Sequence, residues 1–343
     1  MGNYLSGNQF PVQGKTVVIT GGSRGMGLAV GQQLAKKGAN VVIIARDQNK
    51  LLQALEEIKQ AAKDPQTQRF HQLSADLANP SESVRTIDEI VTWNGGHPPD
   101  IVWCCAGTSL PGLFIETPIS HFQSQMDSNY FSSLYMAHAV MTCWIKTAKQ
   151  NKTEASGSQP RNPIPPRHLI FTASFLSFYT FAGYSPYSPT KAALRSLCDS
   201  LSQESNLYAA SYPNEPAIRL HTIFPATILT EAYQAENIIK PDITKKLEGV
   251  DEGQTPEAIA MKSIKGLESG LELITTDFLS ALVQRSVMGG SIRGGPLRML
   301  IDWGLAWLMG LVMVVVRSEM DRTTRNWGRQ YGAAGKTAVN RQA

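Results

Sequence analysis

Short, largely apolar runs alternate along this chain with longer stretches in which hydrophobic residues recur every three or four positions. The runs predict buried strands at residues 15–20, 40–45, 70–75, 100–106, 168–173 and 218–224. The stretches between them have the spacing of amphipathic helices, as at 26–38 and 51–63. Strands that alternate with helices indicate a parallel sheet covered on both faces. With a further run at 271–276, we expect an α/β fold with a doubly wound parallel sheet of about seven strands.

A polar segment rich in Pro and Ser, residues 149–167, interrupts the alternation. The helix before it and the strand after it belong to the same series, so we expect a surface insertion within one domain. We place a single catalytic domain at residues 1–276, with Thr255 and Pro256 at the start of its last helix. Asn151 begins an Asn-Lys-Thr sequon, but a chance match in a cytosolic loop is favoured over glycosylation.

The net charge of +4 belongs to the end of the chain. Residues 317–343 contain six basic and two acidic residues, so the body of the protein is neutral. A neutral body argues against nucleic-acid binding, which needs a basic face. Charged residues make up only 17% of the chain, which indicates a large buried or membrane-facing surface.

The four cysteines are too few and too unevenly spaced for a disulfide framework. No Cys-x-x-Cys pair occurs in the sequence, so we expect neither zinc nor another metal. Reduced thiols in a cytosol-facing domain are the simplest interpretation. The N-terminus has no basic start followed by an apolar core, so it does not resemble a secretory signal.

The chain becomes more apolar near its C-terminus. Residues 299–316 contain a single charge, Asp302, and the uncharged run after it is fourteen residues long. Because about twenty apolar residues are needed to span a bilayer, this length is borderline for crossing. Trp303 and Trp307 suit a membrane interface, and the basic tail suits a cytoplasmic flank.

We expect residues 277–343 to associate with a membrane. If the catalytic domain and the basic tail are both cytosolic, the apolar segment must re-enter or lie in the interface. A monotopic or hairpin anchor is therefore preferred to a single span, with 277–293 as the candidate for the other leg. A buried helix at a dimer interface is the alternative. The start of the chain also fits the N-myristoylation pattern at Gly2.

A glycine-rich turn, Thr-Gly-Gly-Ser-Arg-Gly-Met-Gly at 20–27, follows the first predicted strand and opens a helix. Such a loop lets the backbone approach a pyrophosphate whose negative charge meets the helix N-terminus. Its spacing resembles the cofactor loop of the short-chain dehydrogenase/reductase family, which implies a Rossmann-type fold and a nicotinamide dinucleotide. The cofactor-binding residues expected in this loop are Gly21, Ser23, Arg24, Gly25 and Gly27.

The end of the second strand distinguishes the two nicotinamide nucleotides. An NAD site has an acidic residue there for the ribose hydroxyls. This chain has Arg46 instead, with Arg24 in the glycine loop. Two guanidiniums suit a ribose 2′-phosphate, so we expect NADPH as the cofactor. Asp76, after the third strand, resembles the family residue that contacts adenine, and a turn or cap role is the alternative.

Reduction of a carbonyl by hydride needs a proton for the oxygen, and a tyrosine can supply it if a cation lowers its pKa from about 10. Tyr184 and Tyr187 precede Lys191 by seven and four residues. Either spacing shares a helix face, the longer one only if the helix begins before Tyr184. Pro186 disfavours a helix before it, so we place Ser185 as the cap, Pro186 as the first helical residue and Tyr187 as the acid.

The family resemblance covers about residues 12–276 and implies the other site residues. Ser174 matches the family's serine, which holds the substrate oxygen. Asn129 matches its asparagine, which shapes a helix so that water can link Lys191 to solvent. The cofactor-binding residues that the resemblance adds are Ala106, Gly107, Pro225 and Thr230, together with Tyr187 and Lys191.

The chain departs from the family pattern at two positions. Cys105 stands where asparagine is usual, and Ala226 replaces a common glycine in the loop after the sixth strand. The cysteine puts a structural contact in question, not the chemistry.

Within this family, an NADP preference with a C-terminal apolar segment is similar to the fungal-type 3-ketodihydrosphingosine (3-ketosphinganine) reductases of the endoplasmic reticulum. The stretches that suggest it are "HLIFTASF" (168–175), "YSPTKAALRSLCDSLSQE" (187–204) and "ELITTDF" (272–278). The resemblance implies NADPH-dependent reduction of the C3 ketone of a long-chain base in sphingolipid biosynthesis. We expect a homo-oligomer at the endoplasmic reticulum membrane, with the catalytic domain facing the cytosol. Another membrane-bound reductase, acting on a steroid, retinoid or 3-ketoacyl substrate, is the alternative. A non-catalytic NADPH-binding scaffold is disfavoured by the complete Ser-Tyr-Lys set.

Overall fold

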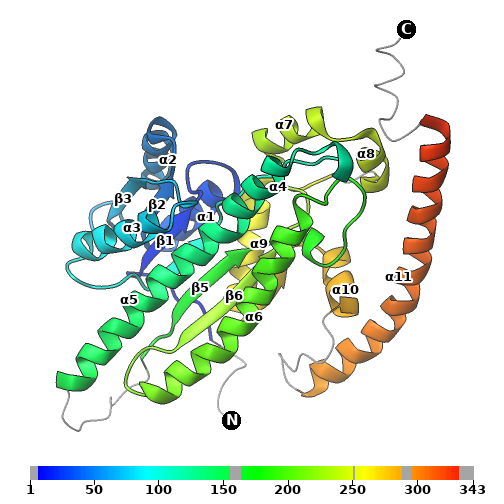
Figure 1. Cartoon of the computed structure of the whole chain (residues 1–343). Coiled ribbons are helices and arrows are strands. Elements are labelled where there is room, and N and C mark those ends of the chain that lie inside the picture. The colour runs from blue at the N-terminus through cyan, green and yellow to red at the C-terminus, as the bar shows by residue number, and fades with distance from the viewer. Residues whose placement is uncertain (1–6, 155–163, 250–251, 288–295, 332–343) are drawn as a thin grey trace.

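The computed structural model of the chain describes residues 7–154, 164–249, 252–287 and 296–331. Its centre is a seven-stranded parallel sheet in the order β3-β2-β1-β4-β5-β6-β7 (Figure 1). The strands are β1 Thr16–Thr20, β2 Asn40–Ala45, β3 Phe70–Ser74, β4 Ile101–Cys104, β5 Arg167–Thr172, β6 Ile218–Phe224 and β7 Leu273–Thr275. Every expected strand is present within two residues of its expected bounds, so the predicted doubly wound α/β fold is confirmed.

The strand order changes direction at β1. This strand pairs with β2 on one side and β4 on the other, and Thr20 lies opposite both Ile44 and Cys104. Connections that leave β1 and β4 on opposite sides open a crevice at the carboxyl ends of the two strands. The glycine-rich turn starts directly after Thr20, so it borders this crevice.

Helices cover both faces of the sheet because side chains alternate along each strand. Val17 and Ile19 of β1 pack among residues of α1, α2 and α9, whereas Val18 packs in the cluster that includes α3, α5 and α6. These helices are α1 Gly25–Lys36, α2 Gln48–Gln60, α3 Pro80–Trp93, α5 Ser132–Glu154, α6 Ser188–Ser211 and α9 Pro256–Glu268. As expected, Pro256 begins α9 and the Thr255 hydroxyl caps it by accepting a backbone hydrogen bond.

The connection between α5 and β5 is shorter than the expected insertion. α5 continues through Glu154, and β5 already begins at Arg167. The prediction that the insertion starts at 149 is therefore wrong, because the Lys, Gln and Glu residues there are good helix formers. The sequon at Asn151 falls in the last turn of α5, and residues 155–163 lie outside the described residues.

Several short elements connect the long helices to the strands. They are η1 Phe114–Glu116, α4 Ile119–Met126, the π-helical turn η2 Asp127–Phe131, η3 Phe175–Ser177, α7 Glu231–Ile239 and α8 Asp242–Glu248. In Figure 1, α4, α7 and α8 lie near one another at one end of the molecule. Backbone and side chains from these elements border the candidate site described below.

Two helices follow β7. α10 Phe278–Val287 packs against β7 and α11, and its Val283 is buried. α11 Pro296–Tyr331 is one helix of 36 residues, about 54 Å long at the usual rise per residue, and it runs along the outside of the domain (Figure 1). Among the described residues, only Leu297–Val316 is long and apolar enough to cross a membrane. This stretch has a mean hydropathy of 2.1, and 6% of it is buried.

Asp302, the single charge of the apolar stretch, is paired with α10. The Asp302 carboxylate lies 2.7 Å from Nε of Arg285. This ion pair makes α10 an attachment of α11 to the domain. Residues 288–293 of the expected second leg lie outside the described residues, so the hairpin anchor stays a prediction.

Candidate active site

The glycine-rich turn closes against the end of β4. Gly21 has a φ of 65°, and its N–H donates to the Ile44 carbonyl at 2.7 Å. A Cβ at this position would lie 2.8 Å from Cα of Ala106, so only glycine fits both the left-handed backbone and the close approach. The Thr20 hydroxyl fixes the same contact, because it accepts from the N–H groups of Cys105 and Ala106, both at 3.1 Å.

The start of α1 fits an anionic cofactor group. Arg24 occupies the N-cap with extended backbone, and its side chain makes no capping hydrogen bond. The N–H groups of the first turn therefore have no side-chain acceptor at the positive end of the helix dipole. A Cβ on Gly27 would collide with the Gly21 carbonyl, so the loop approaches the helix as closely as a backbone can. Such a cradle fits the pyrophosphate of a dinucleotide.

The loop after β6 reaches the same cradle. Cγ2 of Thr230 lies 3.3 Å from the position that a Cβ on Gly25 would occupy. The Thr230 hydroxyl caps α7 by accepting a backbone hydrogen bond at 3.1 Å. At the start of the loop, the Pro225 carbonyl accepts from the N–H of Phe175 at 2.9 Å. The structure thus brings Thr230 to the glycine loop and Pro225 to the segment that contains Ser174.

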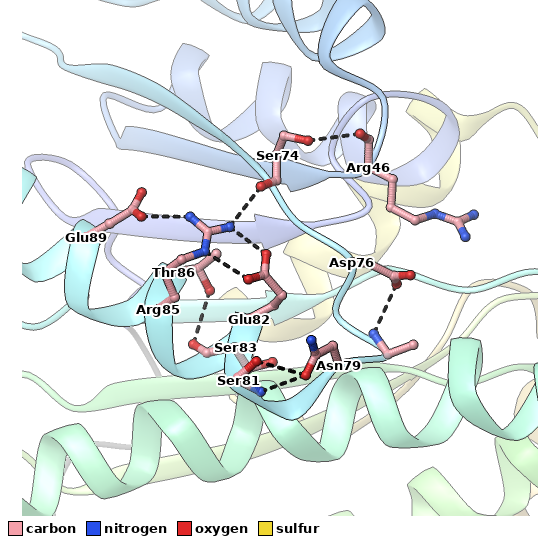
Figure 2. A network of polar contacts seen from close by, with 11 residues as sticks. Arg46, Ser74, Asp76, Asn79, Ser81, Glu82, Ser83, Arg85, Thr86 and Glu89 are labelled. Atoms are coloured by element: carbon pink, nitrogen blue, oxygen red, sulfur yellow. Dashed lines mark hydrogen bonds and ion pairs between the residues drawn. The ribbon is translucent and has the colours of Figure 1, made fainter.

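Two exposed arginines lie where the nucleotide preference was predicted to be decided. Neither Arg24 nor Arg46 forms an ion pair or side-chain hydrogen bond with any residue that the structure describes. Figure 2 shows the Arg46 guanidinium turned away from the neighbouring cluster, in which Arg85 pairs with Glu82 and Glu89. Exposed guanidiniums with no acidic partner fit a phosphate group.

Asp76 makes a turn contact beside Arg46. Its Oδ1 accepts from the N–H of Ala78 at 3.2 Å, and Asn79 caps α3 (Figure 2). The Ser74 hydroxyl donates to the Arg46 carbonyl at 2.9 Å, which ties the ends of β2 and β3 together. A role in this turn accounts for the contacts of Asp76. The expected contact between Asp76 and adenine stays a prediction.

Ser174 and Tyr187 meet beyond the carboxyl end of β5. The Ser174 Oγ caps η3, accepting from the N–H of Leu176 at 3.2 Å. Burial raises the pKa of the Tyr187 phenol, and a hydrogen bond with the Ser174 side chain lowers it by less. The lowering of this pKa that was expected from Lys191 is therefore not found, and the phenol keeps its proton at neutral pH.

α6 begins two residues later than expected, so neither Ser185 as the cap nor Pro186 as the first helical residue is correct. Tyr187 is itself the N-cap, with φ of −99° and ψ of −54°. The start is delayed because a backbone hydrogen bond from Tyr187 N–H to the Tyr184 carbonyl, at 3.1 Å, closes a separate turn. The N–H of Lys191 still donates to the Tyr187 carbonyl at 3.4 Å, so the two residues lie one helical turn apart.

Lys191 is buried behind the phenol. Its Nζ donates to the Thr172 carbonyl at 2.9 Å and lies 5.8 Å from the centre of the Tyr187 ring. Burial lowers the pKa of Lys191 to about 8. Beside it, the Cys105 thiol accepts a hydrogen bond from the Thr172 hydroxyl at 3.4 Å, and burial raises its pKa to about 12. The cysteine at the unusual position thus packs as a neutral group.

Asn129 lies in the π-helical turn η2 and is fully buried. Its side-chain amide donates to the Thr108 carbonyl at 2.9 Å and accepts from the Thr108 N–H at 2.8 Å. A Cβ on Gly107 would lie 2.6 Å from Oδ1 of Asn129 and 3.2 Å from Nζ of Lys191. The loop after β4, the π turn and α6 therefore meet at the lysine, and π turns are frequent at functional sites.

Four residues that the sequence analysis did not connect lie next to this site: Tyr184, Glu236, Lys240 and Glu248. The Tyr184 hydroxyl hydrogen-bonds both carboxylates, which are 52 and 64 positions away along the chain. The one local signal was the spacing of four residues between Glu236 and Lys240, which is also common on solvated helices.

Comparison with known proteins shows the family to which the chain is similar. The short chain dehydrogenase family matches residues 15–238. A 3-ketodihydrosphingosine reductase of Aspergillus fumigatus is 46% identical over 332 residues, which cover 95% of this chain and 88% of that protein. A 3-ketodihydrosphingosine reductase of Neurospora crassa is 39% identical over 333 residues, which cover 97% of this chain and 87% of that protein.

Solved structures share the fold. L-Sorbose reductase from Gluconobacter frateurii, solved with NADPH and L-sorbose, has a TM-score of 0.61 at 22% identity and covers 78% of this chain and 97% of its own. A short-chain type dehydrogenase/reductase from Mycobacterium ulcerans has a TM-score of 0.62 at 19% identity, with 83% and 99% covered. At these identities the likeness extends to the fold alone.

Proposed function

The chain belongs to the short-chain dehydrogenase family, and we propose that it reduces the C3 ketone of 3-ketodihydrosphingosine to the alcohol of dihydrosphingosine. Two reductases of that name align with nearly its whole length. Family membership makes the protein an oxidoreductase with a nicotinamide cofactor, and NADPH is our proposal for that cofactor.

The observation that supports the reaction best is the contact of Ser174 with Tyr187, with Lys191 one turn further along α6. These three side chains lie at the carboxyl edge of the sheet, which the glycine cradle also borders. A proton donor, a group to orient the substrate oxygen and a cation are therefore available at one place.

Reduction of a ketone adds a hydride to the carbon and a proton to the oxygen. A bound nicotinamide dinucleotide supplies the hydride. The Tyr187 hydroxyl donates the proton, and the Ser174 hydroxyl hydrogen-bonds the same oxygen and orients it. As the phenol loses its proton, the Lys191 ammonium stabilises the negative charge that forms on it. Asn129 supports this arrangement, because it holds the loop after β4 against the lysine.

A preference for NADPH is supported by Arg24 and Arg46. Both are exposed and neither has an acidic partner among the described residues, whereas Arg85 nearby is occupied by two carboxylates. A 2′-phosphate would provide the missing partner.

A membrane-resident substrate is supported by the exposed apolar residues. α11 presents a long apolar surface, and further exposed apolar side chains lie near the site on η1, α4 and α7: Phe114, Ile115, Ile119, Ile238 and Ile239. Such side chains suit an alkyl chain. We propose that the enzyme lies at the endoplasmic reticulum membrane with the catalytic domain in the cytosol. The exposed apolar surface supports the membrane part of this proposal.

The experiment is to measure nucleotide oxidation by purified protein with 3-ketodihydrosphingosine, a steroid ketone, a retinoid carbonyl and a 3-ketoacyl thioester, each with NADPH and with NADH. We expect turnover with the first ketone and NADPH, and loss of about 10²-fold or more of kcat in Tyr187→Phe. A higher kcat/KM for any other substrate would overturn the sphingoid assignment. Full-rate turnover by Tyr187→Phe would overturn the mechanism.

A further inference from the structure

A buried ionic cluster joins the turn before α6 to α7 and α8. The Tyr184 hydroxyl lies 2.7 Å from a carboxylate oxygen of Glu236 and 2.6 Å from one of Glu248. Nζ of Lys240 lies 2.7 and 2.8 Å from the two oxygens of Glu248 and 3.2 Å from Glu236. We call these four residues the Tyr184 cluster.

The Tyr184 cluster has more negative than positive charge. Two carboxylates face one ammonium, and the Lys240 side chain is fully buried. A phenol has a single hydrogen to donate. Burial, and then the two carboxylates, raise the pKa of Tyr184, so this hydrogen stays in place at ordinary pH. The hydroxyl is therefore a permanent donor that helps to hold two like charges together.

The backbone of the same turn packs against α8 and the loop after β4. The Thr244 hydroxyl of α8 donates to the Ala182 carbonyl at 2.9 Å, and the N–H of Gly112 donates to the Gly183 carbonyl at 2.8 Å. Gly183 has a φ of 97°, and a Cβ there would collide with Thr244. The turn thus fits against α8 with no room for another side chain.

The other end of the turn holds the candidate catalytic tyrosine. The N–H groups of Tyr187 and Ser188 both donate to the Tyr184 carbonyl, at 3.1 and 2.9 Å. The two tyrosine rings are 6.1 Å apart between centres. The charge of Glu236 also contributes to the raised pKa of Tyr187, which indicates that α7 is electrostatically close to the phenol. Tyr184 therefore binds α7 and α8 with its side chain and the start of α6 with its carbonyl.

We propose that Tyr184 is a positioning residue, whose hydroxyl fixes α7 and α8 beside Tyr187 so that the ketone binds in one place relative to the phenol. The inference rests on the proposed function, because it takes Tyr187 as the proton donor. α7 exposes Ile238 and Ile239, so a displaced α7 loses apolar contacts with a lipid ketone. Tyr184 acts through these helices and touches no reacting atom.

The test is Tyr184→Phe, which keeps the ring and removes the hydroxyl. We expect KM for 3-ketodihydrosphingosine to rise about tenfold while kcat falls less than about threefold, since binding is lost equally from ground and transition states. The Kd for NADPH, measured by nucleotide fluorescence, stays unchanged because the glycine cradle is untouched. Tyr208→Phe, the same exchange at the far end of α6, is the matched control and leaves all three values unchanged.

Glu236→Gln is the second variant, and it alters the same contact from the other side. Glu236→Gln also weakens the pairing of Glu236 with Lys240. We therefore expect the double variant to raise KM by less than the product of the two single effects, whereas independent effects would multiply. Limited proteolysis between residues 231 and 248 adds a readout without turnover. We expect faster cleavage there in Tyr184→Phe than in the wild type.

Wild-type KM and kcat in Tyr184→Phe would overturn the inference. A kcat as low as that of Tyr187→Phe at unchanged KM would also overturn it, because Tyr184 would then take part in the chemistry. Effects that multiply in the double variant would exclude a shared contact. If the wild type does not reduce 3-ketodihydrosphingosine, the proposed function fails, and the proteolysis comparison still decides whether the hydroxyl fixes α7 and α8.

Discussion

Proton transfer depends on Lys191 and Tyr187, and burial favours the neutral form of both side chains. The pKa of Lys191 is lowered to about 8, and that of Tyr187 is raised. Of the two groups, only the lysine changes charge near physiological pH. The alkaline limit of the reaction is therefore expected to follow the lysine.

We predict that kcat/KM for ketone reduction falls as pH rises through about 8. The ammonium that stabilises the forming phenolate loses its charge there, so the protonated fraction of Lys191 limits the rate. The measurement is kcat/KM from about pH 6 to 10, with circular dichroism at each pH to show that the fold is intact. A rate that stays constant or rises to about pH 9.5 would contradict this role of Lys191.

We predict that Gly107→Ala lowers kcat by about 10- to 100-fold, because displacing reacting groups by about 1 Å can cost that much. The added Cβ would lie 2.6 Å from Oδ1 of Asn129 and 3.2 Å from Nζ of Lys191, so both must move. Gly7→Ala is the control, since a Cβ there has no heavy atom within 4 Å. Equal kcat in the two variants would show that the packing at Gly107 is not needed.

At this scale, local spacing located Tyr187 and Lys191, because residues four apart on one helix meet wherever the helix lies. Spacing alone left Tyr184 open, and Pro186 favoured Tyr187 over it. Spacing could not assign the Tyr184 hydroxyl any partner, since Glu236 and Glu248 reach it only after α7 and α8 have packed.

Among the elements, β5 and β6 contain a buried pair of imidazoles. Nδ1 of His168 lies 2.9 Å from Nε2 of His221, and Nδ1 of His221 lies 2.8 Å from the Leu271 carbonyl. These contacts fit two neutral rings, with His168 donating to His221 and His221 donating to the carbonyl. Burial lowers the pKa of both rings, and for His168 the neighbouring His221 lowers it further.

This pair predicts a loss of stability in mild acid. The unfolded histidines have a pKa of about 6.5, above that of the folded ones. Below this pH the unfolded chain binds protons that the folded chain excludes. The free energy of unfolding therefore falls with falling pH, by up to about 1.4 kcal/mol per pH unit for each ring.

Urea unfolding at about pH 7.5, 6.5 and 5.5 measures this slope. His168→Gln removes one of the two rings, so its stability should decline less steeply with acid than that of the wild type. The carboxylates of the two proteins are the same and cancel in the comparison. Identical slopes would mean that the pair does not contribute.

For the whole molecule, α11 is the feature that a soluble catalytic domain does not need. Its apolar stretch Leu297–Val316 is 6% buried. Its described attachments are to α10, partly through Arg285 and Asp302, and to α8. An apolar helix that covers so little of its own domain needs another environment for its surface, and a bilayer provides one.

We predict that a chain ending at Val287 leaves the membrane fraction and keeps its affinity for NADPH within about threefold, because the glycine cradle is independent of α11. Carbonate extraction of microsomes followed by immunoblotting measures the first effect, and nucleotide fluorescence the second. A truncated chain that stays with the membrane would place the anchor elsewhere.

The sequence by itself determined the order of strands and helices, the glycine cradle after β1, and the residues of the candidate site that lie close together along the chain. The order of elements follows from periodicity and the Tyr187–Lys191 pair from spacing and Pro186, and such local patterns act before the chain has packed. Ser174 and Asn129 were implied by the family resemblance. The tertiary structure decided where α6 begins, because the turn at Tyr184, which packs against α8 and the loop after β4, delays it. It alone brought Glu236, Lys240 and Glu248 to Tyr184 and turned α11 outward. Contacts between distant segments depend on how the completed layers pack, and no local pattern contains that information.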